Sequence, residues 1–179
     1  MLTGARLTLR AVTRDDLPRY VAWLNDGDVT KHLSLYLPMN LDDETEWYES
    51  QRHNQTVQNF AIETRDGKHI GSVGLMDIDY RDQSAELGIV IGDKTEWGKG
   101  YGREAIGMLL DFAFNTLNLN RICLQVDTDH PAAIKCYRNC GFVQEGELRH
   151  IIYREGRHTN QYLMSILKSE YRQRQGERD

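Results

Sequence analysis

The sequence predicts a single-domain α/β protein with a mixed, mostly antiparallel sheet flanked by helices. Its 179 residues fit the usual size of one domain. Apolar runs that alternate with polar residues recur along the chain and predict strands. Other stretches have apolar residues three and four positions apart, which predicts helices. These stretches follow the first, fourth and fifth predicted strands. No internal repeat or low-complexity segment divides the sequence.

The first elements are a strand and two helices. Residues 7–10 alternate like a half-buried strand. The apolar positions that follow have the spacing of one buried helix face and are Leu17, Tyr20, Val21 and Leu24. Residues 25–28 should end this helix. A second helix is expected over residues 42–54, after an irregular segment over residues 29–40.

Three antiparallel strands are expected next. Phe60 and Ile62 belong to a strand that turns at residues 66–67, Asp-Gly, into a second strand over residues 70–78. The third strand includes residues 87–91. A long helix should follow over residues 103–116, and because most of its positions are apolar it must lie against the sheet.

The last predicted elements are a strand, a helix and a hairpin. The strand covers residues 121–126, and the helix runs from Pro131 to just before Gly141, the positions that proline and glycine favour at helix ends. The hairpin covers residues 142–167. The domain is therefore expected over residues 1–168, with a polar C-terminal tail, residues 169–179, that should fray together with Lys168.

The charge and cysteine content exclude several classes of protein. Residues 1–86 hold 15 acidic and 9 basic side chains, whereas residues 87–179 hold 12 and 13, so no basic stripe suggests a nucleic-acid partner. No apolar run is long enough for a membrane span or a signal peptide, and we expect a cytoplasmic protein. Three cysteines in that setting do not predict a disulfide framework, and no metal site is predicted.

A glycine-rich segment joins the third antiparallel strand to the long helix. Residues 86–102 read ELGIVIGDKTEWGKGYG, with glycine at 98, 100 and 102. Residues without a Cβ let an anion approach backbone N–H groups at the positive end of a helix, so a phosphate is expected here. The spacing fits neither the dinucleotide fingerprint nor the P-loop. A tight turn without a ligand is the structural alternative.

A second motif supports the phosphate interpretation. Residues 130–142 read HPAAIKCYRNCGF. The two segments resemble the pyrophosphate loop (R/Q-x-x-G-x-G/A) and the N-x-x-A-x-x-x-Y-x-x-x-G-F motif of the GNAT superfamily of acyl-CoA N-acyltransferases. The resemblance extends more loosely over residues 7–167. It is strongest to spermidine acetyltransferases and ribosomal-protein N-terminal acetyltransferases.

The resemblance implies a splayed sheet that admits acetyl-CoA between its fourth and fifth main strands. The residues expected to bind this cosubstrate are Ile89, Val90, Ile91, Trp97, Gly98, Lys99, Gly100, Tyr101, Gly102, Arg103, His130, Ala133, Lys135 and Arg138. Two of them depart from the family pattern. Trp97 stands where Arg or Gln is usual, and His130 stands where Asn is usual. No metal is implied.

Acyl transfer to an amine needs a neutral amine, a stabilised oxyanion and a proton for the leaving thiolate. An alkylammonium of pKa ~10.4 is neutral in roughly one molecule in a few thousand at pH 7, and the resemblance offers Glu86 as the base. A backbone N–H of residues 89–91 would meet the oxyanion. Tyr137, a phenol of pKa ~10, would protonate the thiolate. A surface glutamate and a core tyrosine are the structural alternatives.

These observations predict an acetyl-CoA-dependent N-acetyltransferase that works by direct attack in a ternary complex. A non-catalytic acyl-CoA-binding or regulatory module is the alternative. The acidic residues within 42–49 favour a small amine or polyamine as acceptor. The apolar residues 33–38 stand where spermidine acetyltransferases carry acidic residues, and they favour a protein N-terminus. Neither nucleic acid nor membrane is expected as a partner, and a homo-oligomer is compatible with the sequence.

Overall fold

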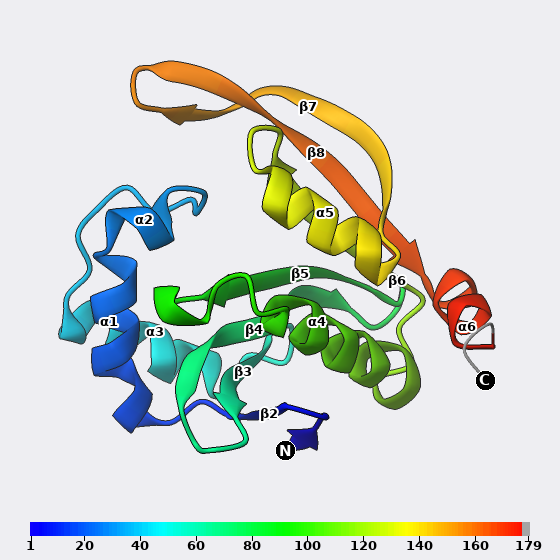
Figure 1. The fold of residues 1–179 in the computed structure, drawn as a ribbon, viewed down its shortest axis with the longest axis horizontal. Coiled ribbons are helices and arrows are strands. Elements are labelled where there is room, and N and C mark those ends of the chain that lie inside the picture. Colours follow the sequence, from blue (N-terminus) through cyan, green and yellow to red (C-terminus); the bar gives the residue numbers. More distant parts are fainter. Residues whose placement is uncertain (177–179) are drawn as a thin grey trace.

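The protein is built on one open, mixed sheet of eight strands. The computed structural model describes residues 1–176, and Figure 1 shows the sheet passing from the N-terminal strands to a long hairpin near the C-terminus. Its strand order is β1-β2-β3-β4-β5-β6-β8-β7. The strands are β1 (Leu2–Thr3), β2 (Leu7–Ala11), β3 (Gln58–Thr64), β4 (His69–Asp79), β5 (Ser84–Ile91), β6 (Arg121–Asp127), β7 (Val143–Arg154) and β8 (Arg157–Leu167).

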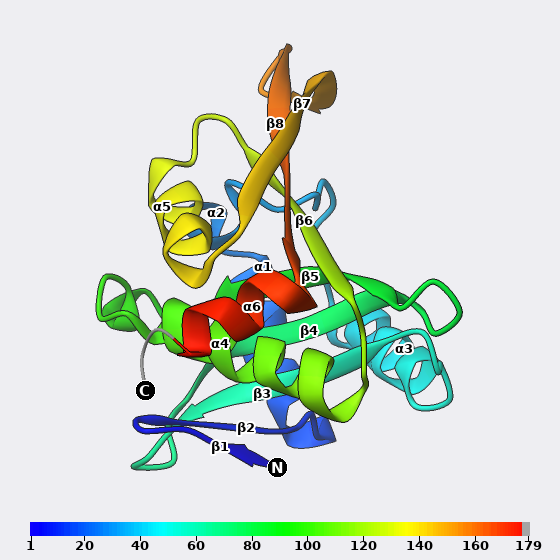
Figure 2. The ribbon, with the colours of Figure 1, turned by 90° about the vertical axis from the view of Figure 1, so that its right-hand side faces the viewer.

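Helices cover both faces of the first half of this sheet. Figure 2 shows α4 in front of strands β2–β5 and α1 behind them. The helices are α1 (Leu17–Leu24), α2 (Gly27–Thr30), α3 (Leu41–Gln51), α4 (Tyr101–Asp111), α5 (Pro131–Cys140) and α6 (Lys168–Gly176), with short helical turns η1 (Arg14–Asp16), η2 (Lys94–Glu96) and η3 (Phe112–Thr116). Within the described residues, no helix has the length and apolar content needed to span a membrane.

The sheet divides where its one parallel pair ends. Strands β5 and β6 pair over only three positions, Ser84 with Arg121, Ala85 with Ile122 and Glu86 with Cys123. Residues 87–91 of β5 then pair with β4 alone. Figure 2 shows β6, β8 and β7 turning steeply away from β2–β5. The predicted splay between the fourth and fifth main strands, here β5 and β6, is therefore present.

The main core lies between the sheet and α4. Alternate residues of the central strands, such as Val73, Leu75 and Leu87, are buried on that side. They meet the apolar stripe of α4, including Ile106 and Leu109. This packing confirms that the helix expected from residue 103 lies against the sheet, and it fixes the start of α4 at the end of the glycine-rich loop.

Three local features differ from the sequence prediction. Residues 25–28 do not simply end α1, because Asp26 accepts a hydrogen bond from the Asp28 N–H (2.9 Å) and starts the short helix α2. The last turn of the long helix, residues 112–116, is a π-helix. Residues 2–3 form β1, a strand too short to show an alternating pattern in the sequence.

The prediction that the C-terminal tail frays is wrong for Lys168–Gly176, which form α6. Tyr171 is buried, its ring lies 5.1 Å from that of Phe114, and its hydroxyl donates to Asp111 Oδ1 at 3.2 Å. Tyr171 therefore anchors an otherwise polar helix in the core, and Arg174 adds a hydrogen bond to the Asn139 carbonyl at 3.2 Å. Residues 177–179 of the predicted tail lie outside the described part of the chain.

Candidate active site

The glycine-rich loop presents a row of free backbone N–H groups. Gly98 and Gly100 have φ of +75° and +83°, the left-handed region that favours glycine, and Gly100 is the N-cap of α4. Among residues 1–176, the N–H groups of residues 98–103 find no hydrogen-bond acceptor. Together with the helix dipole, these N–H groups have the geometry that anion-binding sites use. Gly102 differs, because it lies within the helix at negative φ.

Side chains around the loop hold it in place. Arg6, just before β2, donates to the Lys99 carbonyl (2.9 Å), pairs with Glu104 (2.8 Å) and stacks over the Tyr101 ring. The Trp97 indole N–H donates to the Ile91 carbonyl at 2.7 Å. This contact gives the unusual Trp97 a role, because it ties the loop to the end of β5. Arg6 was not predicted as part of this site, because it is 93 residues from Lys99 in the sequence.

The predicted cationic residues are not equally available to a phosphate. Lys99 is already paired with Glu96, Nζ to Oε2 at 2.8 Å, and Arg138 donates to Gln144 at 3.2 Å. Arg103 and Lys135 are exposed and form no ion pair within the described residues. Arg103 lies next to the loop N–H groups in the first turn of α4. It is therefore the best placed of the four to meet a phosphate.

The unpaired edge of β5 adjoins the loop. A Cβ at Gly102 would lie 4.0 Å from the Ile89 side chain, so α4 begins beside the strand. Residues 87–91 lack a partner strand on the β6 side. This edge includes Ile89, Val90 and Ile91, all half-buried. It offers the backbone groups that an extended pantetheine arm requires.

Glu86 stands where the splay begins. It is the last residue of β5 that pairs with β6, opposite Cys123, and it pairs with Met76 on β4. Burial, and then the nearby charge of Asp77, raise the pKa of its carboxyl group. Within the described residues the Glu86 carboxylate has neither a hydrogen bond nor an ion pair. A half-buried carboxylate without a partner has the properties of a general base.

Helix α5 carries the predicted acid and part of the predicted cofactor site. Burial raises the pKa of Tyr137, as do the thiols of Cys136 and Cys140. The Tyr137 ring packs against Phe142 (5.9 Å between centroids), and its hydroxyl has no hydrogen bond within residues 1–176. Ala133 packs against the core. Cys140 Sγ lies 3.8 Å from the Arg103 carbonyl, so α5 meets the start of α4.

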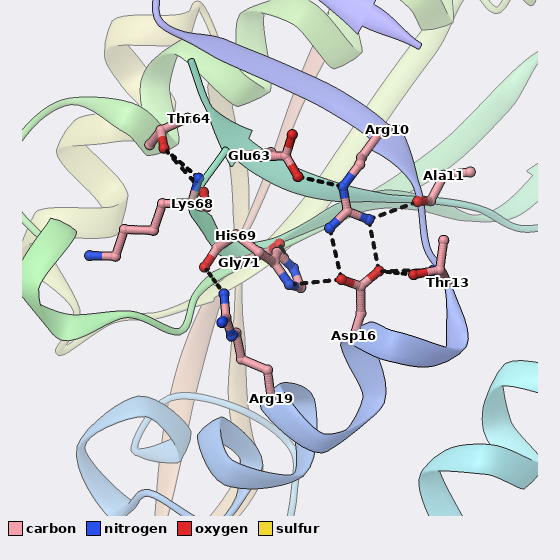
Figure 3. Close-up of polar contacts among 10 residues, drawn as sticks. All are labelled: Arg10, Ala11, Thr13, Asp16, Arg19, Glu63, Thr64, Lys68, His69 and Gly71. Atoms are coloured by element: carbon pink, nitrogen blue, oxygen red, sulfur yellow. Dashed lines mark hydrogen bonds and ion pairs between the residues drawn. The ribbon is translucent and has the colours of Figure 1, made fainter. Parts of the chain in front are cut away.

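A buried polar network anchors α1 behind the sheet. Figure 3 shows Arg10 of β2 bound to Asp16 through two hydrogen bonds of 2.8 Å, with Arg10 Nε also donating to Glu63 of β3. His69 Nδ1 lies 3.1 Å from Asp16 Oδ1, and Arg19 of α1 donates to the His69 carbonyl. Three strands and α1 are thereby joined. The Trp23 side chain of α1 then packs on Gly92, just after β5.

The acidic residues of α3 are only partly available to a cationic substrate. Glu49 pairs with Arg14 and Arg52, and Asp43 closes the helix cap by accepting from the Asn40 N–H. Glu44 is buried, and burial raises its pKa. The sequence therefore overstated the free negative charge of this segment.

A short segment crosses the open end of the splay. Helix α2, which precedes it, is held beside the end of β5 by Lys94 Nζ, which lies 2.7 Å from Asp26 and 2.8 Å from Asp28. Residues 31–33, here called the 31–33 bridge, follow α2 directly. His32 Nδ1 lies 2.9 Å from Oδ2 of Asp127, the last residue of β6. The segment from Asp26 to Leu33 therefore links Lys94, shortly after β5, with the end of β6.

Asp127 is the far anchor of this bridge. It is only 2% exposed and accepts hydrogen bonds from Arg154 of β7 and Gln161 of β8 in addition to His32. Burial alone would raise the pKa of Asp127, but the Arg154, Gln161 and His32 contacts lower it. Arg154 also donates to the Leu33 carbonyl at 3.2 Å. In Figure 1 the β7–β8 hairpin extends above α2 on the side where β5 ends.

The His130 side chain contacts the 31–33 bridge. It is the N-cap of α5, and its ring stacks on His32 with centroids 4.0 Å apart. Burial and the neighbouring His32 lower the pKa of His130. Ligand atoms of His32, Asp127 and Asp129 lie within 4.8 Å of one another, a set of groups that could hold a metal ion. Because Arg154 already neutralises Asp127, we interpret the cluster as an ion-pair network.

Known proteins resemble this chain over most of its length. The family model described as an acetyltransferase (GNAT) domain matches residues 6–143. Spermidine N(1)-acetyltransferase of Vibrio cholerae is 36% identical over 169 residues, which cover 94% of this chain and 96% of that protein. Spermidine N(1)-acetyltransferase of Escherichia coli K12 is 33% identical over 172 residues, which cover 96% of this chain and 91% of that protein.

The fold is likewise shared with solved structures. The structure of spermidine N-acetyltransferase from Vibrio cholerae in complex with CoA and spermine matches with a TM-score of 0.89 at 34% identity. The match covers 94% of this chain and 99% of that chain. The similarity therefore includes both halves of the splayed sheet.

Proposed function

The chain belongs to the GNAT acetyltransferase family, as its two motifs predicted, and on that premise we propose that it transfers acetyl from acetyl-CoA to a primary amine by direct attack in a ternary complex. The observation that carries the proposal is the combination of the free N–H groups of residues 98–103 with the unpaired edge of β5. The free N–H groups fit a pyrophosphate, and the unpaired strand edge fits the pantetheine arm. No covalent enzyme intermediate is required.

We propose that Glu86 removes the proton from the acceptor ammonium. Its raised pKa brings the carboxylate closer to the range in which a base works at neutral pH. Its place at the branch of β5 and β6 gives it access to the splay. Deprotonating an alkylammonium at pH 7 costs ~4–5 kcal/mol, and Glu86 would assist this step.

Backbone and phenol groups would complete the reaction. A backbone N–H of residues 89–91 donates to the oxyanion that forms on the acetyl carbonyl. Tyr137 donates its proton to the leaving sulfur, and its raised pKa keeps the phenol protonated at neutral pH. The backbone N–H groups of residues 98–103 bind the phosphates, together with the side chains of Arg103 and Lys135. His130 and Ala133 lie at the start of α5.

Two classes of acceptor have support. Small amines and polyamines are favoured by the relatives, which are named as spermidine acetyltransferases. A protein N-terminus is the second candidate, because Tyr36 and Leu37 are 67% and 75% exposed beside α2 and α3 and suit apolar side chains next to the reacting amine. An α-amine of pKa ~8 also needs less help to lose its proton.

Release of free thiol from acetyl-CoA tests the proposal. The protein is incubated with acetyl-CoA and spermidine, with simple diamines, and with peptides that carry a free N-terminus. We expect thiol release that depends on the amine, together with an acetylated product of the matching mass. Binding of acetyl-CoA without turnover of any amine would instead indicate a non-catalytic acyl-CoA-binding module.

A further inference from the structure

Helix α5 carries two thiols on one face. Cys136 and Cys140 are four positions apart, so their side chains lie one above the other on the helix. Both are partly buried against the core, and Cys140 Sγ lies 3.8 Å from the Arg103 carbonyl at the start of α4. The third cysteine, Cys123, lies on β6, and its thiol donates to the Ala85 carbonyl. The reaction proposed above uses none of the three thiols.

The two thiols of α5 differ in acidity. The hydrogen bond that the Cys140 thiol donates lowers the pKa of Cys136, while burial opposes this shift and the charge of Arg103 adds to it. The same contact, together with burial, raises the pKa of Cys140. Burial also raises the pKa of Cys123. Cys136 is therefore the thiol that ionises first, and the thiolate is the form that reacts with oxidants.

A small cleft borders this pair. It has a volume of about 70 Å³ and lies between α4, α5 and α6, where its lining includes Arg103, Cys140, Tyr171 and Arg174. A space of this size admits a few molecules as small as water, so hydrogen peroxide fits. The two guanidinium groups supply the positive surroundings that favour a thiolate.

We propose that Cys136 and Cys140 form an oxidation site, at which hydrogen peroxide converts the two thiols reversibly into a disulfide within α5. The Cys136 thiolate attacks one oxygen of the peroxide, the O–O bond breaks, and the products are a sulfenic acid and hydroxide. The Cys140 sulfur then attacks the sulfenic sulfur and forms the S–S bond. The hydroxide that it displaces takes the Cys140 proton and leaves as water. The peroxide is reduced to water, and the two thiols are oxidised to one disulfide.

The disulfide requires a change in the last turn of α5. Cα atoms four residues apart in an α-helix are separated by about 6 Å, which lies within the range that a disulfide spans. The Cβ atoms of such a pair are about 5–6 Å apart, whereas a disulfide brings them to about 4 Å. The bond must therefore draw the two residues together. A strained disulfide of this kind is readily reduced, which suits a regulatory bond.

The affected turn adjoins the proposed active site. Tyr137 follows Cys136 directly, and its carbonyl accepts from the Phe142 N–H at 3.0 Å. Cys140 contacts Arg103, beside the free N–H groups of the glycine-rich loop. A misplacement of about 1 Å can lower a catalytic rate by ~10²-fold. Resting on the acetyltransferase function proposed above, the disulfide inhibits the enzyme until a reductant cleaves it.

Peptide mapping tests the oxidation site without any measurement of activity. The protein is treated with hydrogen peroxide, blocked with an alkylating agent and cleaved with trypsin, which cuts after Arg138, between the two cysteines. We expect residues 136–138 to be recovered joined to residues 139–149, and a reductant to separate them. Sulfinic acids without this linkage, or disulfides between separate molecules, would overturn the inference.

Serine variants identify the thiol that reacts first. Cys140→Ser keeps a hydroxyl donor beside Cys136, and its oxidation should stop at a sulfenic acid that a sulfenic-specific probe labels. Cys136→Ser should be labelled at least ~10-fold more slowly, because the remaining thiol is the less acidic one. Cys123→Ser is the matched control and should form the linked peptide like the wild type. Equal labelling of Cys140→Ser and Cys136→Ser would overturn the assignment of Cys136.

Activity is measured on oxidised and reduced protein after the peroxide has been removed, with the acetylated amine detected by its mass. We expect oxidation to lower kcat/KM at least ~10-fold, a reductant to restore it, and Cys136→Ser to stay active after the same treatment. Full activity of protein that carries the disulfide would overturn the regulatory part of the inference. If the reduced protein acetylates no amine, the proposed function fails, whereas the linked peptide of the wild type still decides the oxidation site. The same map decides alone if a serine variant does not fold.

Discussion

Glu86 and Cys123 form the last matched pair of the parallel ladder between β5 and β6. One residue further along, the two strands have separated. A side chain at this branch is held by strands on both sides, yet it borders the splay through which we propose that the substrate enters. That combination of a fixed backbone and access to the opening suits a group that must remove a proton.

Replacing Glu86 with Gln should shift the pH dependence of kcat/KM towards alkaline pH, because more of the amine must then arrive neutral. Asp77→Asn is the complementary variant. The charge of Asp77 raises the pKa of Glu86, so its removal should lower that pKa and move the acidic limb of the profile to lower pH. A Glu86→Gln profile identical to the wild type would exclude Glu86 as the base.

Replacing Tyr137 with Phe should lower kcat by ~10²–10⁴ while acetyl-CoA still binds, since only the proton donor is lost. Single-turnover kinetics and calorimetry measure the two effects separately. Tyr80→Phe, at an exposed turn position, controls for the general effect of removing a phenol. Wild-type turnover by Tyr137→Phe would assign Tyr137 to the core alone.

Replacing Gly100 with Val should weaken CoA binding by about tenfold or more, because a non-glycine residue at φ +83° costs roughly 1–2 kcal/mol and a branched Cβ obstructs a phosphate. Gly98→Val should act in the same way. Gly107→Ala, at an exposed position of α4 with open space around it, is the control. Undiminished affinity in a folded Gly100→Val protein, measured by calorimetry, would place the phosphates elsewhere.

Replacing Asp16 with Asn should destabilise the protein by about 2 kcal/mol near neutral pH. Burial alone would raise the pKa of Asp16, but the Arg10, Thr13 and His69 contacts lower it from 3.8 to about 2. A depressed carboxyl pKa adds stability above pH ~4, and this stability is lost as the pH falls towards 2. Thermal melts of Asp16→Asn should therefore show less loss of stability over that interval. Asp15→Asn, which is exposed, should melt like the wild type.

The sequence predicted the parts of the fold that depend on local patterns. Alternation and helical spacing placed the central strands and the long helices, and glycine spacing located the loop whose Gly98 and Gly100 have positive φ. Helix α6 was missed because its contacts are with residues distant in the sequence: Tyr171 meets Asp111 and Phe114, and Arg174 donates to the Asn139 carbonyl. A polar segment with one aromatic residue has no helical periodicity to detect.

The candidate site was predicted less completely, for the same physical reason. Trp97 and His130 were identified as departures from a motif, but their partners were not. His32 meets Asp127 across 95 residues, and Arg6 meets Lys99 across 93. A lone histidine or arginine at either position carries no local signal, since only the fold brings the pairs together.

The brevity of the β5–β6 ladder also affects how the native protein opens. Strands β1–β5 come from one continuous stretch of chain and strands β6–β8 from another, and three residue pairs join them within the sheet. Each stretch keeps its own hydrogen-bonded neighbours if that joint parts, and we predict that the two open as units of local unfolding although their side chains share one core. A cosubstrate bound between the two stretches would supply hydrogen-bond partners for the edges of β5 and β6 that lack a neighbouring strand. Amide exchange along the facing edges of β5 and β6 should therefore slow more on acetyl-CoA binding than exchange within either unit.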